Sequence, residues 1–417
     1  FAMTASGMRF RRARFRRTRF RRTRFRRAVS AVLLIFLIPA VLSGCWDSRE
    51  LNEMFIVTGI SLDKAEKSNE MNIAFQIGKP EAKGAVTPGG GGSLNEKPTI
   101  LVRSTADTVS GAVLDIDRDS SRTLMLDHNQ ALLIGSDLAM QGGIKDHLDL
   151  FLRNEQTRME ELIMVVDGHA EKLLTVDTGE DRISGIYLWR MIQKLSQASP
   201  YYHVRLQDFV TRLLEQTTSP IAPIVTLMKI NDKDRIKIVG LAVFKGDRVI
   251  GRLDNQDVPG YIWAMGDVKA GKYKTKSESG TAEMNITNLD CKRDVILRED
   301  GRVQVRLNVD ASAVVGELKG FQGFTPDELM TYLVAASRNE IRKSIVNTFE
   351  LARDLDADIY GIGMSVYRKY PRKWRKMKKQ WDHLFPETEL DVKVRVQIPS
   401  TGQVVESLEM GVEQNED

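Results

Sequence analysis

Cysteine is scarce in this chain: its 417 residues include only two, Cys45 and Cys291. A disulfide framework like that of small secreted domains is therefore excluded, because two cysteines form one bridge at most. If Cys45 is covalently modified, Cys291 has no partner within the chain. We expect the hydrophobic core to hold the fold together. The contents of 42% apolar and 28% charged residues are typical of a folded protein.

Histidine is also rare, and the motifs of common enzyme classes are missing. No two of the five histidines have metal-ligand spacing, and the chain contains no HExxH, no phosphate-binding loop and no Gly-x-Ser-x-Gly elbow. Asp115, Asp117 and Asp119 resemble the start of a calcium loop. The pattern then fails, because Ser120 stands where the loop needs glycine and Leu126 where it needs glutamate.

The glycines at 361 and 363 are only a fragment of a nucleotide-binding fingerprint, since the third glycine is missing. They predict a tight turn after the preceding helix. The sequence thus supports no enzymatic activity, no metal and no cofactor, although catalytic groups dispersed along a chain leave no local motif.

Acidic residues are absent from the first 44 positions, which contain 12 arginines and no lysine. The whole chain has 61 basic and 56 acidic residues and a formal net charge of +5. Without the first 44 positions, 61 − 12 = 49 basic residues stand against 56 acidic ones, a net charge of −7. The basic character therefore belongs to the N-terminal segment, and we predict no nucleic-acid partner.

The apolar run at residues 31–40 is too short for a comfortable transmembrane helix, which needs roughly 20 residues. A basic region, a short apolar run and small residues in that order predict a signal peptide over residues 1–44. The run ends in Leu42-Ser43-Gly44-Cys45, which matches the bacterial lipobox. We expect cleavage between Gly44 and Cys45, a diacylglyceryl group on the Cys45 thiol, and a further acyl chain such as palmitate on the new N-terminus. Several chains together anchor a protein stably. The alternative is an uncleaved N-terminal anchor with an incidental cysteine.

Residues 9–28 are four copies of a five-residue Arg-Phe-Arg-Arg unit ending in Ala or Thr. This leader is longer than a signal peptide requires, and Met8 is an alternative start. We interpret the repeat as a disordered basic leader without a separate function.

Apolar and polar periodicity predicts alternating strands and helices in the first half of the mature chain. Strands are expected at 55–60, 71–77, 127–134 and 162–166, and helices at 105–119, 138–151, 170–174, 183–195 and 206–216. A Gly-rich loop at 79–98 interrupts this series, and Ser219-Pro220 with Pro223 marks a break.

The second half shows hairpin patterns and one long helix. Strands at 236–244 and 248–253 are joined by Lys245-Gly246-Asp247. Residues 302–309 and 390–398 alternate strictly between apolar and polar, which is typical of antiparallel sheets with one face in water. Between them, Thr325-Pro326-Asp327-Glu328 is a capping box, and it predicts a helix to about residue 354.

A basic segment rich in aromatic residues lies at 367–385. Its aromatic residues repeat every three to four positions, and lysines and arginines occupy the other faces. One interpretation is ordinary core packing with a solvated charged face; the other is an amphipathic helix that contacts a partner or an anionic membrane. The residues assigned to this partner or membrane surface are Lys373, Trp374, Lys376, Met377, Lys379 and Trp381.

These elements predict an α+β fold with mixed and antiparallel sheets, packed helices and three domains. The expected boundaries are 1–44 for the leader and signal peptide, 45–200 for an N-terminal α/β domain, 201–320 for a middle domain and 321–417 for a C-terminal domain.

Three sequence blocks together resemble the Ger(x)C family, the C-subunit lipoproteins of spore nutrient germinant receptors. They are Cys45-Trp46-Asp47 with Glu50-Leu51, the stretch 240–253, and the stretch 358–363 continuing through Trp374 and Trp381 to the strand ending at Ile398. The Arg-Phe leader and the Gly-rich loop depart from the family pattern without touching a motif.

The resemblance implies three mixed α/β domains and no enzymatic activity. It further implies lipid attachment at the outer face of the spore inner membrane and assembly with an A subunit and a multi-span B subunit. Two alternatives stay open. A free-standing solute-binding lipoprotein would capture a nutrient itself, and a lipid-anchored hydrolase would need a reproducible activity that one point mutation abolishes.

Overall fold

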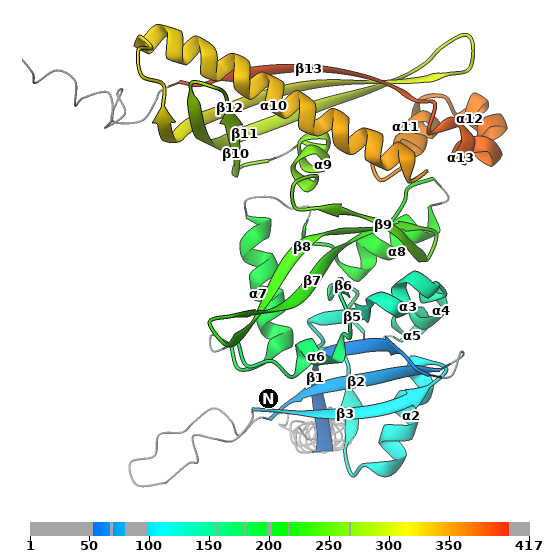
Figure 1. Cartoon of the computed structure of the whole chain (residues 1–417). Helices are drawn as coiled ribbons and strands as arrows, with labels where there is room; N and C mark the ends of the chain where they lie inside the picture. The colour runs from blue at the N-terminus through cyan, green and yellow to red at the C-terminus, as the bar shows by residue number, and fades with distance from the viewer. Residues whose placement is uncertain are drawn as a thin grey trace, which may run out of the picture. The chain divides into compact units, whose positions relative to one another are not determined.

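The computed structural model describes residues 53–66, 70–79, 98–154, 157–178, 181–197, 202–215, 217–266 and 268–399. Gly44, Cys45 and the rest of the predicted signal peptide lie outside these ranges, as does most of the predicted Gly-rich loop. Nearly all of the described residues belong to one compact unit that begins at Phe55. Its fold is α+β, as predicted, and contains two sheets (Figure 1).

The first sheet is mixed and has nine strands in the order β3-β2-β1-β5-β6-β7-β8-β9, with β4 paired to β1. The four central strands β1, β5, β6 and β7 run parallel, and antiparallel pairs flank them on both sides. The strands are β1 (Met54–Lys64), β2 (Met71–Gly78), β3 (Thr99–Ala106), β4 (Thr123–Met125), β5 (Ala131–Gly135), β6 (Leu162–Val166), β7 (Ile221–Ile230), β8 (Lys233–Lys245) and β9 (Arg248–Asp254).

Helices cover both faces of this sheet, so its central strands read as continuous apolar runs. Every residue of β5 is buried. Ala131 and Leu133 face one hydrophobic cluster, and Leu132 and Ile134 face another, because successive side chains of a strand point to opposite faces. One cluster contains α6 (Glu171–Leu174) and α7 (Ser184–Ser196); the other contains α2 (Val109–Asp119), α3 (Ser136–Gln141), α4 (Ile144–His147), α5 (Asp149–Arg153) and α8 (Leu206–Leu214).

The second sheet has four strands in the order β10-β11-β12-β13 and packs against the long helix α10 (Pro326–Asp354) (Figure 1). Its strands are β10 (Gly271–Lys276), β11 (Gly280–Leu297), β12 (Val303–Gly320) and β13 (Glu389–Gln397). The predicted alternation in β12 is confirmed, since Val303, Val305, Leu307 and Val309 are all buried. The helix α9 (Val258–Met265) joins the same core.

The last strand differs from the expectation of antiparallel pairing. β13 runs parallel to β12, from Gln304 opposite Glu389 to Ser312 opposite Gln397. The reason is the connection, because α10 and the short helices after it carry the chain back to the starting end of β12. Arg395 pairs with Asp310 across the two strands at 2.6 Å. Alternation thus identified a half-buried strand but not its direction.

The predicted capping box of α10 is present. The Thr325 hydroxyl accepts a hydrogen bond from the Glu328 N–H, and the Glu328 carboxylate accepts one from the Thr325 N–H at 2.9 Å. Leu333, Ile341 and Ile345 then form the buried stripe.

Three predicted elements were wrong in extent. The strand expected at 127–134 begins only at Ala131, as β5. The helix expected at 138–151 is three short helices, and its first break falls at Gly142 and Gly143, whose φ angles are 90° and 82°. The helix expected from residue 105 starts at Val109, and β3 occupies the preceding positions. The predicted domain boundaries stay predictions; strands on both sides of residue 200 belong to the first sheet, and elements on both sides of residue 320 share one core.

Candidate functional site

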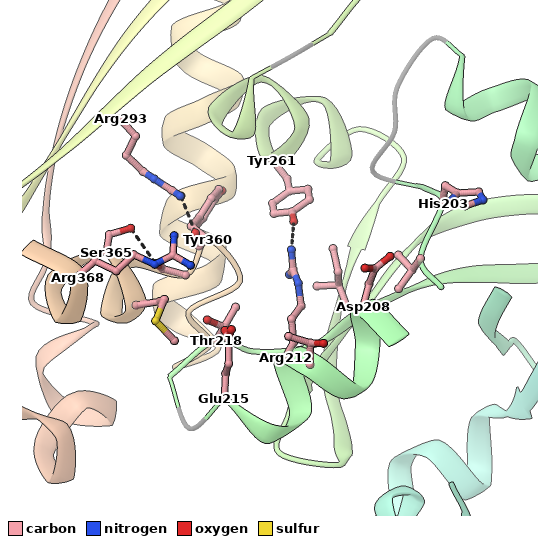
Figure 2. Close-up of a pocket in the computed structure, with 15 residues that line it drawn as sticks. His203, Asp208, Arg212, Glu215, Thr218, Tyr261, Arg293, Tyr360, Ser365 and Arg368 are labelled. Carbon is pink, nitrogen blue, oxygen red and sulfur yellow. Dashed lines mark hydrogen bonds between the residues drawn. The ribbon is translucent and has the colours of Figure 1, made fainter. Parts of the chain in front are cut away.

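A polar cavity of about 400 Å³ lies where α8, α9, the start of α11 (Ile362–Lys369) and β11 approach one another. It is the setting of Figure 2, in which side chains from these four elements face a common space. Its volume is in the range typical of small-molecule sites. The sequence positions that contribute to it extend from His203 to Arg368.

Two arginines converge on one short backbone segment at this cavity. Arg212 of α8 donates hydrogen bonds to the Ile359 carbonyl at 3.3 Å and to the Tyr261 hydroxyl at 3.2 Å. Arg293 of β11 donates to the Tyr360 carbonyl at 2.5 Å (Figure 2). Since the two carbonyls belong to consecutive residues, the two guanidinium groups are held against the same strip of backbone.

These guanidinium groups lack acidic partners. Within the described part of the chain, no carboxylate lies within 4.0 Å of Arg212, Arg293 or the nearby Arg368, although 13 other arginine and lysine side chains are shown with such a partner. Two carboxylates do line the cavity, Asp208 and Glu215. Asp208 is already paired with Arg205, through contacts of 2.9 and 3.1 Å. The cavity wall is therefore predominantly cationic.

Two buried hydroxyl groups, on residues that line the same cavity, have no hydrogen-bond partner among the described residues. They belong to Thr218 and Tyr360, whose exposed fractions are 8% and 4%. Burial raises the pKa of Tyr360 well above its usual value, so its hydroxyl keeps its proton. Buried hydroxyls are nearly always hydrogen-bonded in folded proteins. The residues of the cavity lining thus include two hydroxyls that are unpaired among the described residues, and neighbouring atoms cover both oxygens.

A buried carboxylate fixes the backbone that forms one wall. Asp358 accepts hydrogen bonds from the Ile362 and Gly363 N–H groups, at 2.9 and 2.7 Å, and from Trp381 Nε1 at 3.3 Å. It thereby caps the N-terminus of α11, where a negative charge is favourable. Burial nonetheless raises the pKa of Asp358 to about 6. The predicted tight turn is present here, since Gly361 has a φ of 67°.

The predicted partner or membrane surface is not one amphipathic helix. The chain forms α12 (Pro371–Met377), a 3-10 turn η4 (Lys378–Gln380) and α13 (Trp381–Leu384). Trp374 and Trp381 are 4% and 3% exposed, and their ring centroids lie 5.2 Å apart in an edge-to-face pair. Met377 packs against the same core. These three side chains therefore belong to the core, and their assignment to a partner or membrane surface is corrected.

The basic side chains of this segment, in contrast, are exposed. Six of them define what we call the cationic face: Arg372, Lys373, Arg375, Lys376, Lys378 and Lys379. No ion pair involves any of the six within the part of the chain that the structure describes. The predicted residues Lys373, Lys376 and Lys379 thus lie together on an uncompensated surface.

Sequence reasoning did not find the cavity. Arg212, Arg293 and Tyr360 are far apart in the chain and belong to no motif, so only folding brings them together. Within the described ranges, no group of three His, Cys, Asp or Glu residues could hold a metal ion. No helix in those ranges is both long and apolar enough to cross a membrane.

Two family models match the chain in succession. Residues 47–227 match the spore germination protein N-terminal domain, and residues 239–402 match the C-terminal domain described as spore germination B3/GerAC-like. Two similar proteins are spore germination protein KC and spore germination protein YndF of Bacillus subtilis (strain 168). Protein KC is 26% identical over 89% of this chain and 95% of its own length, and YndF is 22% identical over 90% and 97%.

The fold is also known from a solved structure. The crystal structure of the GerBC protein superposes with a TM-score of 0.54 at 16% sequence identity, covering 82% of this chain and 97% of GerBC. Both family domains are thus present in order, on a fold shared with GerBC. The chain belongs to the GerAC-like family of spore germination proteins, which the sequence blocks predicted.

Proposed function

We propose that this protein is a lipid-anchored, non-catalytic subunit of a spore nutrient germinant receptor. In this proposal it assembles with an A subunit and a membrane-embedded B subunit at the outer face of the spore inner membrane. The observation that carries the proposal is the order of features along the chain. The lipobox cysteine, Cys45, stands two positions before residue 47, where the match to two successive germination domains begins.

The anchor has a direct test. We expect Cys45→Ala to abolish incorporation of labelled fatty acid and to leave an unprocessed precursor. Cys291→Ser is the matched control, because Cys291 is the free thiol of β11, and burial raises its pKa to about 11, which makes it a poor nucleophile. Normal labelling of Cys45→Ala would refute lipid attachment at this position.

The cationic face is the surface we assign to assembly. Residues 45–417 have a net charge of −7, yet the cationic face keeps six basic side chains together with no ion pair in the described part of the chain. Such a face suits an acidic partner surface. With Trp374 and Trp381 in the core, the face offers charge and little apolar area, which favours a protein surface over insertion into lipid.

Charge reversal tests this surface. Lys373, Lys376 and Lys379 are all exposed, so replacing them with Glu should leave folding intact and weaken recovery of the other subunits. The matched control replaces Lys233, Lys237 and Lys272, which are exposed lysines on other elements. Equal recovery with both triple variants would show that the cationic face serves solubility alone.

Assembly itself is tested by affinity purification of the tagged protein from spore membranes in mild detergent, with mass spectrometry of the bound proteins. Recovery of a multi-span membrane protein and a second large subunit supports the receptor proposal. Recovery of this protein alone, under conditions that keep other membrane complexes intact, supports the alternative of a free-standing solute-binding lipoprotein.

A further inference from the structure

The cavity between α8, α9, β11 and α11 has a chemistry that assembly does not explain. We infer that it is a binding site for a small solute carrying a carboxylate or phosphate group, held by Arg212, Arg293 and Arg368. The inference goes beyond receptor assembly and does not depend on it, because it concerns this chain alone.

Arg212 and Arg293 have N–H donors that the oxygen acceptors described above do not use. A guanidinium has five N–H donors, and the contacts described above use two of those of Arg212 and one of those of Arg293 on oxygen acceptors. The remaining donors border the cavity, and the planar guanidinium fork matches the two oxygens of a carboxylate or phosphate. Backbone carbonyls hold the two groups in place but do not neutralise their charge.

Two residues of the cavity lining carry buried hydroxyl groups that are unpaired among the described residues. Thr218 and Tyr360 line the cavity with no hydrogen-bond partner in the described ranges, and both are more than nine-tenths buried. A hydroxyl that keeps its proton donates readily to an oxyanion. Both oxygens are covered by neighbouring atoms, so an anion held by the arginines would reach them only after a local movement of the side chains that cover them.

The other ionisable side chains of the cavity lining do not cancel the charge of the arginines. Asp208 is neutralised from outside by Arg205. Burial lowers the pKa of His203, so this imidazole is neutral at pH 7 and adds no charge of its own. Glu215 is the remaining carboxylate in the cavity lining, which also contains three arginines, and the buried Asp358 acts electrostatically on Arg212 and Arg293. The excess of positive side chains in the cavity lining favours an anion over a cation or a neutral sugar.

The residues of this cavity come from both family domains of the chain. Arg212 and Thr218 belong to the part of the chain that matches the N-terminal family domain, and Arg293, Tyr360 and Arg368 belong to the part that matches the C-terminal one. A bound anion would therefore contact both domains at once and stabilise their association.

The test measures the melting temperature of the purified full-length protein in mild detergent with inorganic phosphate, acetate or succinate, against chloride at equal ionic strength. Binding to the folded state alone gives a saturable rise in melting temperature. We expect such a rise for at least one probe. A rise with phosphate alone would identify a phosphate-bearing ligand. A rise with acetate or succinate would identify a ligand with a carboxylate.

Variants locate the effect. Arg293→Gln and Arg368→Gln should each weaken the apparent affinity roughly tenfold or more, the usual effect of removing a charged hydrogen bond. The Arg368 side chain is exposed and has no ion pair among the described residues, so Arg368→Gln keeps the test valid if Arg293→Gln fails to fold. Arg395→Gln, an exposed arginine on β13, should bind like wild type. The inference is overturned if no probe gives a saturable rise, or if Arg368→Gln and Arg395→Gln respond equally.

Discussion

Removal of the Asp358 carboxylate should destabilise the protein strongly, because three donors depend on it. Asp358 is 4% exposed, and Asp358→Ala leaves the N–H groups of Ile362, Gly363 and Trp381 Nε1 buried without an acceptor. Each orphaned donor costs about 1–3 kcal/mol. Three donors give a loss of roughly 3–6 kcal/mol in the free energy of unfolding at pH 7.5, since some of them will regain water.

The loss should also depend on pH. The folded-state pKa of Asp358 is about 6, above its ordinary value of 3.8. Between these values the folded state binds more protons, so this group makes the wild-type protein less stable as pH rises from about 4 to about 6. At pH 5 the wild-type side chain contributes about 1 kcal/mol more than at pH 7.5. Asp358→Ala lacks the carboxyl group that binds this proton. The loss in its free energy of unfolding relative to wild type should therefore be larger at pH 5.

Urea unfolding followed by circular dichroism at the two pH values measures both quantities. Asp382→Ala is the matched control, because Asp382 belongs to the same region but is exposed and makes only a 3.8 Å contact with Lys245. A deficit for Asp358→Ala below about 1 kcal/mol would refute the three-donor argument. A deficit that is equal at both pH values would refute the assigned pKa.

Three further predictions concern other positions. Burial raises the pKa of Glu161 to about 8, so wild-type stability should fall as pH rises from about 4.5 to 8, and Glu161→Gln, tested by thermal melts across that range, should flatten the curve. A Cβ on Gly363 would lie 2.8 Å from Trp381 Nε1, so Gly363→Ala should lower the urea midpoint and shift tryptophan emission; an unchanged spectrum would contradict that contact. Thr325→Ala should cost about 1 kcal/mol in urea unfolding by removing the capping box, and Thr325→Ser should restore most of it.

The elements that sequence predicted best are those whose signals are local. The capping box at Thr325 and the hairpin at Lys245–Asp247 depend on neighbouring residues, and both are present. The 18-residue strand β11 was missed, because its apolar and polar residues do not alternate strictly along its length. Its antiparallel pairing with β12 holds it in the extended conformation. Pro223 was interpreted as a break, yet it lies within β7.

In the candidate site, too, the features that were predicted are local in sequence, and the feature that was missed depends on the fold. The cationic face was visible in the sequence, because its residues are contiguous. Whether the neighbouring tryptophans pointed to the core or to a partner could not be decided from spacing, since an aromatic stripe of helical period suits both. The cavity was not predictable, because only the folded chain brings Arg212 and Arg293 together and places no carboxylate of the described residues within 4.0 Å of either guanidinium.

The parallel pairing of β12 with β13 has a consequence for how the protein is made. Gln304 meets Glu389, a residue 85 positions later, so this edge of the second sheet stays open until almost the whole described chain has been synthesised. Contacts so distant in sequence form slowly, and an exposed strand edge is a template for pairing with other chains. A chain that ends before Glu389 should therefore leave the edge of β12 unpaired and be prone to aggregation.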